Sequence, residues 1–421
     1  MATGNAFNRR LFLRGAGGLA AASALAACGG NTGREDSSSG SGKTISQWYH
    51  QYGEAGTQQA AQKYADAYKD AKINMQWVPG DYDNKISSGL LASDGPDVFE
   101  WHFNYQLAKS NQVVPLDDIL GDAKSDYSEA DLFSNSLDGK VYGIRMIDDP
   151  QLIFYRKSML DKAGVAPPTT IDELIAATKA LTTKDVKGLF IGNDGGVAWA
   201  ANHVVPAAGH QYLTSDRKVD FNNDAVASAM LKVRELMATK GLLLGAPTEW
   251  WDPSAFNQGL CAITRQGLWA MPAVQKALGD DFGVIPTPSF GATGKPAIYL
   301  GGWSTFVSAK AKDVDAAKAF VKWLWIDNTE YQEDWALNYG FHIPPRKSLA
   351  AKAAKLQSGP AAETLKLTEQ YGWVDDPAFT QTMRTTFTDA VTNIVQKNKD
   401  PKSELAGAAS KVDAELKSLF G

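Results

Sequence analysis

The chain has 421 residues, 44% of them hydrophobic and 21% charged, and a formal net charge of −5. These fractions are ordinary for a soluble globular protein, and an acidic chain without basic clusters argues against nucleic-acid binding. Since there are only 2 cysteines, neither a disulfide framework nor a structural zinc site is expected. Cys261 lies in an apolar context and is predicted to be a buried small hydrophobe.

The N-terminus carries an export pattern. Arg9 and Arg10 precede Leu-Phe-Leu, a mild apolar run follows at 15–27, and Leu-Ala-Ala leads into Cys28. The arginine pair resembles a twin-arginine signal, and the last four residues resemble a lipobox. This implies export of a folded chain, cleavage before Cys28 and acylation of that cysteine. A membrane-spanning anchor is the alternative, but the run is too short and too rich in Gly and Ala.

Three consecutive regions are therefore expected. Residues 1–27 are predicted to be a twin-arginine-type lipoprotein signal peptide. Residues 28–42, rich in Gly and Ser, are predicted to be the lipidated cysteine and a flexible tether. The rest of the chain is too long for one small core, so two lobes are expected. No later stretch is apolar enough to cross a bilayer.

The first elements after the tether alternate between strand and helix. Alternating polarity predicts strands at 44–49, 73–78 and 97–101. Apolar residues with helical spacing predict helices between them, at 60–68 and 86–92. This order is typical of a parallel sheet with right-handed crossovers.

Aromatic and hydrogen-bonding side chains gather where these strands end. Ligands of parallel α/β sheets bind at the carboxyl ends of the strands. Indole faces fit the apolar C–H faces of pyranose rings, and many of the 12 tryptophans stand beside Gly, Asn, Asp or His. The strand ends therefore predict a sugar site, and they carry Trp48, Tyr49, His50, Glu54, Asp81, Tyr82, Trp101, His102 and Asn104.

The next landmark is a crossing of the chain between the two lobes. Two strand-like runs, 137–145 and 152–157, flank a polar break at 148–150. A proline stop follows, and then Thr170 with Glu173 three residues later predicts a capping box at the start of a helix.

Several segments together resemble family 1 extracellular solute-binding proteins, the maltose-binding-protein-like receptors of ABC importers. The resemblance covers 43–421 in the order of the family, although Tyr155-Arg156 stands where the family usually has Tyr-Asn. The order of the segments, and no single motif, carries it. The segments are Gly139–Ile144, Phe154–Lys157, Pro168–Leu174, Ala255–Gly259, Gly267–Ala270, Gly301–Ser304, Ala316–Leu324 and Tyr339–Arg346.

The resemblance implies an α/β, two-lobe periplasmic-binding-protein fold of type II, the Venus-flytrap architecture. Its sheets are parallel-cored, flanked by helices and joined by crossing strands. The N-terminal lobe is expected to be 43–148 plus 300–346, and the C-terminal lobe 149–299 plus 347–421. The lobes close over a ligand and present a surface to the transmembrane subunits of the permease. We expect a monomer that performs no catalysis, needs no cofactor or metal, and is anchored by lipid to the outer face of the cell membrane.

The resemblance and the strand ends together give the expected ligand contacts. The resemblance implies sugar contacts for Trp101, Asn104, Asp149 and Trp269, and it places Glu54 and Asp81 more loosely. The complete set is Trp48, Glu54, Asp81, Trp101, Asn104, Asp149, Trp199, Trp269 and Trp303.

Ordinary structural roles stand beside these. The tryptophans could be core residues, and Asp149 before Pro150 could initiate a turn. Trp199 is balanced between cleft and packing, whereas burial is slightly favoured for Trp250 and Trp251. Helical spacing assigns Trp323, Trp325 and Trp335 to the core.

Other classes of function remain open. A surface glycoside hydrolase needs two carboxylates at a set separation; Asp81, Glu100 and Asp149 are possible members, but no local motif pairs them. A redox enzyme would need a GxGxxG, a cysteine cluster or spaced histidines, which the sequence lacks. Among ligands, a neutral or amino sugar or an oligosaccharide fits best. A cationic solute remains possible, and a phosphodiester would need clustered Arg or Lys.

Overall fold

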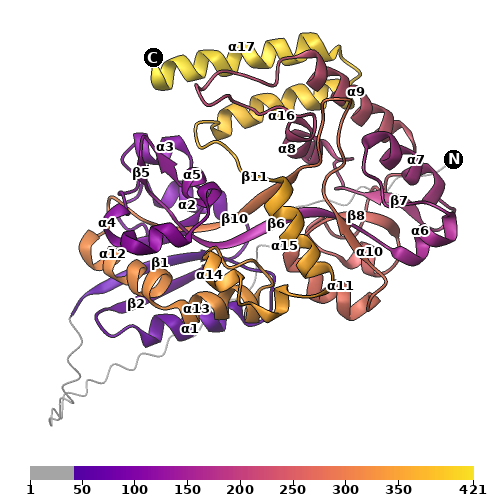
Figure 1. Ribbon diagram of the computed structural model, residues 1–421. Helices are drawn as coiled ribbons and strands as arrows, with labels where there is room; N and C mark the ends of the chain where they lie inside the picture. The colour runs from indigo at the N-terminus through magenta and orange to yellow at the C-terminus, as the bar shows by residue number, and fades with distance from the viewer. Residues whose placement is uncertain (1–41) are drawn as a thin grey trace, which may run out of the picture. The chain divides into compact units, whose positions relative to one another are not determined.

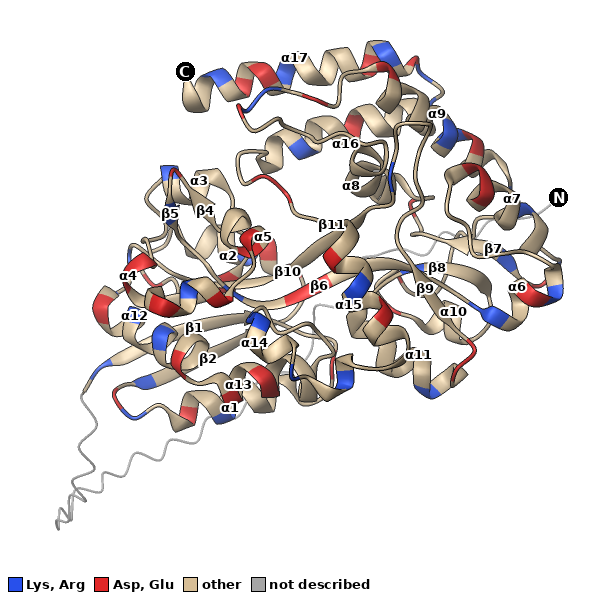
Figure 2. Cartoon of the chain, in the orientation of Figure 1, with Lys and Arg blue, Asp and Glu red and all other residues tan. Residues whose placement is uncertain are grey.

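A computed structural model describes residues 42–421 (Figure 1). The predicted signal peptide, Cys28 and the tether up to residue 41 lie outside the described residues. Within the described part, basic and acidic residues are spread over many elements (Figure 2). None of the helices in 42–421 is both long enough and apolar enough to span a bilayer.

The alternation of strand and helix predicted for the first hundred residues is confirmed. The elements are β1 (Thr44–His50), α1 (Thr57–Ala67), β2 (Lys72–Val78), α2 (Tyr82–Gly89) and β3 (Val98–Trp101). β1 pairs in parallel with both β2 and β3. Because successive side chains of β1 point to opposite faces, Tyr49 joins one apolar core cluster and Trp48 another. This part of the sheet is therefore covered on both faces.

The remaining elements around β1–β3 are short helices and one small hairpin. Before the crossing they are α3 (Tyr105–Lys109), α4 (Asp117–Leu120), η1 (Gly121–Asp126), α5 (Glu129–Ser134), β4 (Ser136–Leu137) and β5 (Lys140–Val141). Later in the chain come α12 (Val314–Lys322), η3 (Trp323–Asp327), α13 (Thr329–Asp334), η4 (Trp335–Tyr339), α14 (Lys347–Ala350) and η5 (Ala354–Leu356). Trp325 and Trp335 are buried in the core as predicted, and Trp323 packs half-buried against it.

Two long antiparallel strands, β6 (Ile144–Tyr155) and β10 (Ile298–Val307), join the two parts of one sheet. The strand order is β2-β1-β3-β10-β6-β8-β7. The break expected at 148–150 was wrong: Pro150 pairs with Leu300 inside a continuous β6, because the ladder to β10 continues through the polar residues. The lobe boundaries predicted after 148 and 299 fall inside these two strands.

The second part of the sheet is built from β7 (Lys187–Phe190) and β8 (Cys261–Gly267), which pair in parallel, with β9 (Gly283–Ile285) on β6. The flanking elements are α6 (Lys157–Ala163), α7 (Ile171–Leu181), α8 (Val197–Ala207), α9 (Asp224–Ala238), α10 (Ser254–Asn257), η2 (Leu268–Ala270) and α11 (Met271–Leu278). The last segment adds α15 (Gly359–Tyr371), β11 (Gly372–Trp373), α16 (Gln381–Val395) and α17 (Pro401–Phe420). Figure 1 shows α16 and α17 lying beside α8 and α9.

Two local predictions for this part are confirmed. The hydroxyl oxygen of Thr170 accepts the N–H of Glu173 at 3.2 Å, and the Glu173 carboxylate accepts the N–H of Thr170 at 3.2 Å, which completes the capping box that starts α7. Cys261 is a buried free cysteine in β8. Both follow from local sequence alone, since a cap and an apolar run need no distant partner.

Candidate ligand-binding cavity

A cavity of about 1470 Å³ lies beside the crossing strands. Its walls come from segments far apart in the sequence: the loop after β1, residues before α10, the start of α11, the stretch after η4 and the start of α15. Asp149 of β6 and Trp303 of β10 also line it. Pockets for drug-sized ligands are about 300–1,000 Å³, so this cavity accommodates a larger molecule than a single small ring.

A buried imidazole joins two carboxylates at the cavity. His342 Nδ1 contacts the Asp149 carboxylate, and Nε2 lies 3.4 Å from Glu54 Oε1. Burial lowers the pKa of His342, but the two carboxylates outweigh burial and raise that pKa to about 10. Burial alone would raise the pKa of Glu54, yet His342 holds it below the ordinary value. At neutral pH His342 is therefore an imidazolium that contacts Asp149 and the ionised Glu54.

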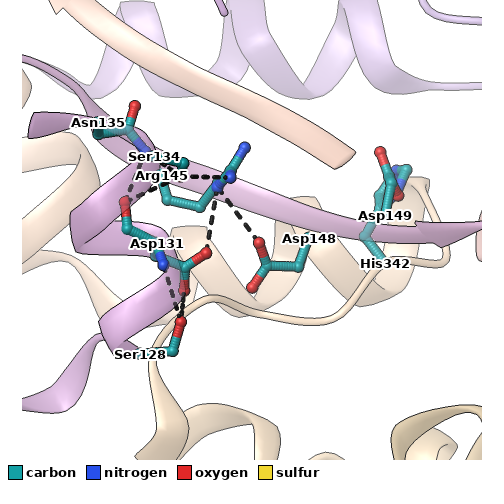
Figure 3. Close-up of polar contacts among 8 residues, drawn as sticks. All are labelled: Ser128, Asp131, Ser134, Asn135, Arg145, Asp148, Asp149 and His342. Atoms are coloured by element: carbon teal, nitrogen blue, oxygen red, sulfur yellow. Dashed lines mark hydrogen bonds and ion pairs between the residues drawn. The ribbon is translucent and has the colours of Figure 1, made fainter. Parts of the chain in front are cut away.

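Backbone pairing places His342 next to Asp149. The N–H of Ile343 donates to the carbonyl of Asp148 at 3.0 Å, and the N–H of Asp148 donates to Ile343 at 2.9 Å. Figure 3 shows His342 and Asp149 side by side, apart from the neighbouring Arg145 network.

That network fixes the strand just before Asp149. Arg145 Nε lies 3.3 Å from a carboxylate oxygen of Asp131 and 3.3 Å from one of Asp148, and its Nη2 donates to Ser134 at 3.0 Å (Figure 3). Burial lowers the pKa of Arg145, but the two carboxylates outweigh burial and hold it above the ordinary value. Arg145 is thus a paired buried cation that ties β6 to α5.

Aromatic and polar side chains of the first part of the sheet form one wall. The His50 ring stacks on Trp303 with centroids 3.9 Å apart and an interplanar angle of 19°. His50 is held by Glu100, whose Oε1 accepts its backbone N–H at 2.7 Å, and the hydroxyl of Tyr52 donates to Oε2 of Glu100 at 2.6 Å. Glu100 is itself buried, so it orients the wall rather than facing the ligand.

Three tryptophans from the part of the chain around β8 form a second wall. Trp269 Nε1 donates to the carbonyl of Trp251 at 3.0 Å, and the Trp250 ring lies 5.9 Å from the Trp269 ring. Trp251 is 56% exposed. A Cβ on Gly267 would come within 1.7 Å of the Trp269 ring, so the ring occupies space that only glycine leaves open. The slight preference for burial of Trp250 and Trp251 was wrong, because both line the cavity.

The structure brings four of the predicted contact residues to the cavity: Glu54, Asp149, Trp269 and Trp303. The other five lie elsewhere: Trp48, Asp81, Trp101, Asn104 and Trp199.

Two of these five cap helices. The Asp81 carboxylate accepts the N–H of Asn84 at 3.1 Å at the start of α2. The side-chain oxygen of Asn104 accepts the N–H of Leu107 at 3.2 Å at the start of α3. A polar residue just after a strand serves the next helix as readily as a ligand.

The other three are tryptophans with protein partners. Trp199 is part of α8, is 0% exposed and packs in the core, which leaves it no surface for a sugar. Trp48 is buried between β1 and α2. Trp101 is half-buried and its Nε1 donates to Asp83 at 2.7 Å.

His342 and the Trp250–Trp251 pair are cavity residues absent from the predicted contact set. The partner of His342, Asp149, is 193 positions away, so no local pattern links them. His50 and Tyr52 could be recognised as candidates from the sequence, because they directly follow the first predicted strand and ligands bind at the carboxyl ends of such strands.

Comparison with known proteins decides the family. The model of bacterial extracellular solute-binding proteins matches residues 49–324, more than half of the chain. The chain belongs to this family. The solute-binding protein is 26% identical to the diacetylchitobiose binding protein DasA of Streptomyces coelicolor, covering 93% of this chain and 94% of that protein. It is 22% identical to the galactooligosaccharide-binding protein of Bacillus subtilis, covering 93% and 94%.

A solved structure confirms the fold. The GacH receptor of Streptomyces glaucescens matches the solute-binding protein with a TM-score of 0.76 at 22% identity, covering 89% of this chain and 99% of that chain. The two-lobe architecture with crossing strands is thus confirmed. The family consists of exported binding proteins of ABC transporters rather than enzymes.

Proposed function

We propose that this solute-binding protein captures an oligosaccharide in the cavity and delivers it to the transmembrane subunits of an ABC permease. The observation that carries the proposal is the convergence of Trp269 and Trp303 with Glu54 and Asp149 on one cavity of about 1470 Å³. The printed names of the relatives, which specify diacetylchitobiose and galactooligosaccharides, support a carbohydrate.

The chemistry of these side chains suits a sugar. Indole faces pack against the C–H faces of pyranose rings, while ionised carboxylates accept hydroxyl protons in hydrogen bonds roughly twice as strong as neutral ones. His342 keeps Asp149 and Glu54 in place, since its imidazolium contacts both. The ligand is thus met by fixed acceptors between aromatic walls.

The same electrostatics favour binding over hydrolysis. A glycosidase needs one carboxyl with a raised pKa to protonate the leaving oxygen. The pKa of Glu54 is instead lowered by His342, so Glu54 is ionised at neutral pH and serves as an acceptor. We therefore propose that ligand leaves the cavity chemically unchanged.

The anchor is a separate part of the proposal. The Leu-Ala-Ala-Cys segment supports acylation of Cys28, so that the tether holds a monomeric receptor at the outer face of the membrane. Metabolic labelling with a fatty acid tests it: the natural chain should become labelled and Cys28→Ala should not.

The function is tested by titrating the full chain carrying Cys28→Ser with neutral oligosaccharides, amino sugars, phosphodiesters and polyamines, followed by tryptophan fluorescence. Saturable binding of an oligosaccharide, recovered intact by chromatography, is the expected result. Cleaved sugar would make the protein a hydrolase, and saturation by a polyamine or phosphodiester alone would replace the ligand class.

A further inference from the structure

Near the cavity, three residues carry buried nitrogen atoms that make no hydrogen bond. These residues are Arg265 on β8, His203 on α8 and Trp373 on β11, and they lie around Tyr299 of β10. Among residues 42–421, Nε and Nη1 of Arg265, Nε2 of His203 and Nε1 of Trp373 are buried and make no hydrogen bond to the protein. Buried polar groups are usually paired. Single unpaired indole nitrogens also occur at Trp325 and Trp335, whereas here a charged side chain and two rings with unpaired nitrogens lie together.

Arg265 is the central member. Arg265 is only 3% exposed. Its Nη2 donates one hydrogen bond, to Oε1 of Gln151 at 2.5 Å. Its guanidinium carbon lies 3.7 Å from the centre of the Trp250 ring. None of the ion pairs found in 42–421 includes Arg265, although the charge of Asp194 acts on it from farther away. Burial lowers its pKa to about 9.

His203 and Trp373 both lie beside Tyr299. The Tyr299 ring lies 6.2 Å from the His203 ring and 5.0 Å from the Trp373 ring. Tyr299 is also the cross-strand partner of Gln151, which bonds Arg265. Burial and the charge of Arg265 lower the pKa of His203 well below its ordinary value. His203 is then neutral, and its Nδ1 lies 3.4 Å from the Thr287 hydroxyl. In the tautomer whose Nδ1 accepts from that hydroxyl, Nε2 carries the hydrogen and is an unpaired donor.

The cluster lies next to residues that line the cavity. Alternate residues of a strand share a face, so Gln151 lies on the face of Asp149 and Tyr299 on the face of Trp303. Asp149 and Trp303 line the cavity, and so does Trp250, whose ring covers Arg265. Gln151, which accepts from Arg265, is therefore two residues along β6 from Asp149, and the Trp250 ring, which lines the cavity, covers the Arg265 guanidinium.

Other arginines of the protein show what a purely structural role looks like. Arg145 is also buried, but two carboxylates and a serine occupy its nitrogens. Arg384 donates to Asp375 at 2.6 Å and to Asn202 at 3.0 Å. A buried cation without a paired anion is costly, and Arg265 departs from this pattern while lying next to the ligand cavity.

We propose that the Arg265 cluster is a subsite for an sp² oxygen of the carbohydrate, either the carboxylate of a uronic acid or the carbonyl of an acetamido group. The inference rests on the proposed function and deepens it. The ligand oxygen enters beside Trp250, which moves off the guanidinium, and it accepts hydrogen bonds from Arg265, with His203 and Trp373 as further donors. A sugar that carries only hydroxyl groups is a poorer partner, because each hydroxyl oxygen is a neutral acceptor that also carries a hydrogen needing its own acceptor.

Three β-1,4-linked disaccharides test the subsite by calorimetric titration of the full chain carrying Cys28→Ser: cellobiose, N,N′-diacetylchitobiose and cellobiouronic acid. We expect at least one of the latter two to bind about tenfold or more tighter than cellobiose, in line with hydrogen bonds to a charged group. Arg265→Met should remove this preference and leave the affinity for cellobiose unchanged. Which sugar is preferred identifies the oxygen as acetamido or carboxylate.

The melting temperatures of two arginine variants distinguish a binding role of Arg265 from a structural one. Since Arg265 has no paired anion, Arg265→Met should not lower the melting temperature, whereas the control Arg145→Met should lower it by leaving Asp131 and Asp148 unpaired. If Arg265→Met does not fold, Trp373→Phe removes a single donor and should weaken the preferred disaccharide alone.

Equal affinity for the three disaccharides, or an equal loss for all three in Arg265→Met, would overturn the subsite while leaving the proposed function intact. Binding of no carbohydrate would overturn both.

Discussion

Two tryptophans of similar appearance in the sequence have different surroundings in the structure. Trp269 lines the cavity with its Nε1 bonded to the carbonyl of Trp251, whereas Trp199 has no exposed surface and packs with Phe290. The first is available to a ligand and the second stabilises a core. Substitutions should separate these roles.

Trp269→Ala should weaken oligosaccharide binding by about 2 kcal/mol, roughly thirtyfold, as for aromatic residues at the centre of an interface. Its melting temperature should stay close to that of the natural chain, because Trp269 is only partly buried. Trp199→Ala should instead cost about 3–5 kcal/mol of unfolding free energy. Calorimetric titration and urea unfolding of both variants check this, and unchanged affinity in Trp269→Ala would contradict it.

His342 makes stability depend on pH in the alkaline range. Its pKa is about 10 in the folded protein against an ordinary 6.5. The imidazolium therefore stabilises the fold fully below pH 6.5, and this contribution is lost as pH rises through 10. We expect the free energy of unfolding of the natural chain to fall by on the order of a few kcal/mol across that range. The control His342→Gln should show a clearly smaller loss in urea unfolding at pH 6, 8 and 10. An equal fall in unfolding free energy with pH in the natural chain and in His342→Gln would mean that other titratable groups cause the pH dependence.

At the scale of elements, strands and helix caps could be predicted because their causes are local. Alternating residues gave β1, β2 and β3, and Thr170 with Glu173 gave the start of α7. The residues of the candidate site were harder to predict from the sequence, because the same residue types cap helices and bind sugars. Asp81 and Asn104 were predicted as ligand contacts, yet their side chains accept N–H groups of α2 and α3. His342 could not be paired with Asp149 from local sequence.

The two caps should affect stability and leave binding unchanged. Asp81→Ala and Asn104→Ala should each lower the free energy of unfolding by about 1 kcal/mol, the usual effect of losing an N-cap. Affinity for the oligosaccharide should stay within twofold, since neither residue lines the cavity. Chemical unfolding and calorimetric titration of the same samples provide the measurement. A tenfold loss of affinity in either variant would return that residue to the binding site.

At the scale of the whole described chain, the cavity walls come from both parts of the sheet. His50 and Glu54 follow β1, whereas Trp250 and Trp269 belong to the part around β8. A ligand that contacts both walls favours the arrangement in which they face each other, and only to the extent of its preference for that arrangement.

Bound oligosaccharide should therefore stabilise the protein against unfolding. At a ligand concentration 100 times Kd the gain should be about 2.7 kcal/mol, measured as a rise in melting temperature with the disaccharide or oligosaccharide that titrates. In Trp269→Ala, with its affinity weakened roughly thirtyfold, the gain at the same concentration should fall to about 0.9 kcal/mol. A full rise in that variant would place the ligand elsewhere.

The position of β10 has a consequence for the order in which the protein is made. β10 lies between β3 and β6, yet the ribosome adds it long after both. Until residues 298–307 have emerged, β3 has one unpaired edge and β6 lacks its main partner, so neither part of the sheet can be completed during synthesis. Such late long-range pairing slows folding and exposes strand edges. A chain of this topology matures as a whole, and the arginine pair at 9–10 predicts an export route that accepts proteins after they have folded.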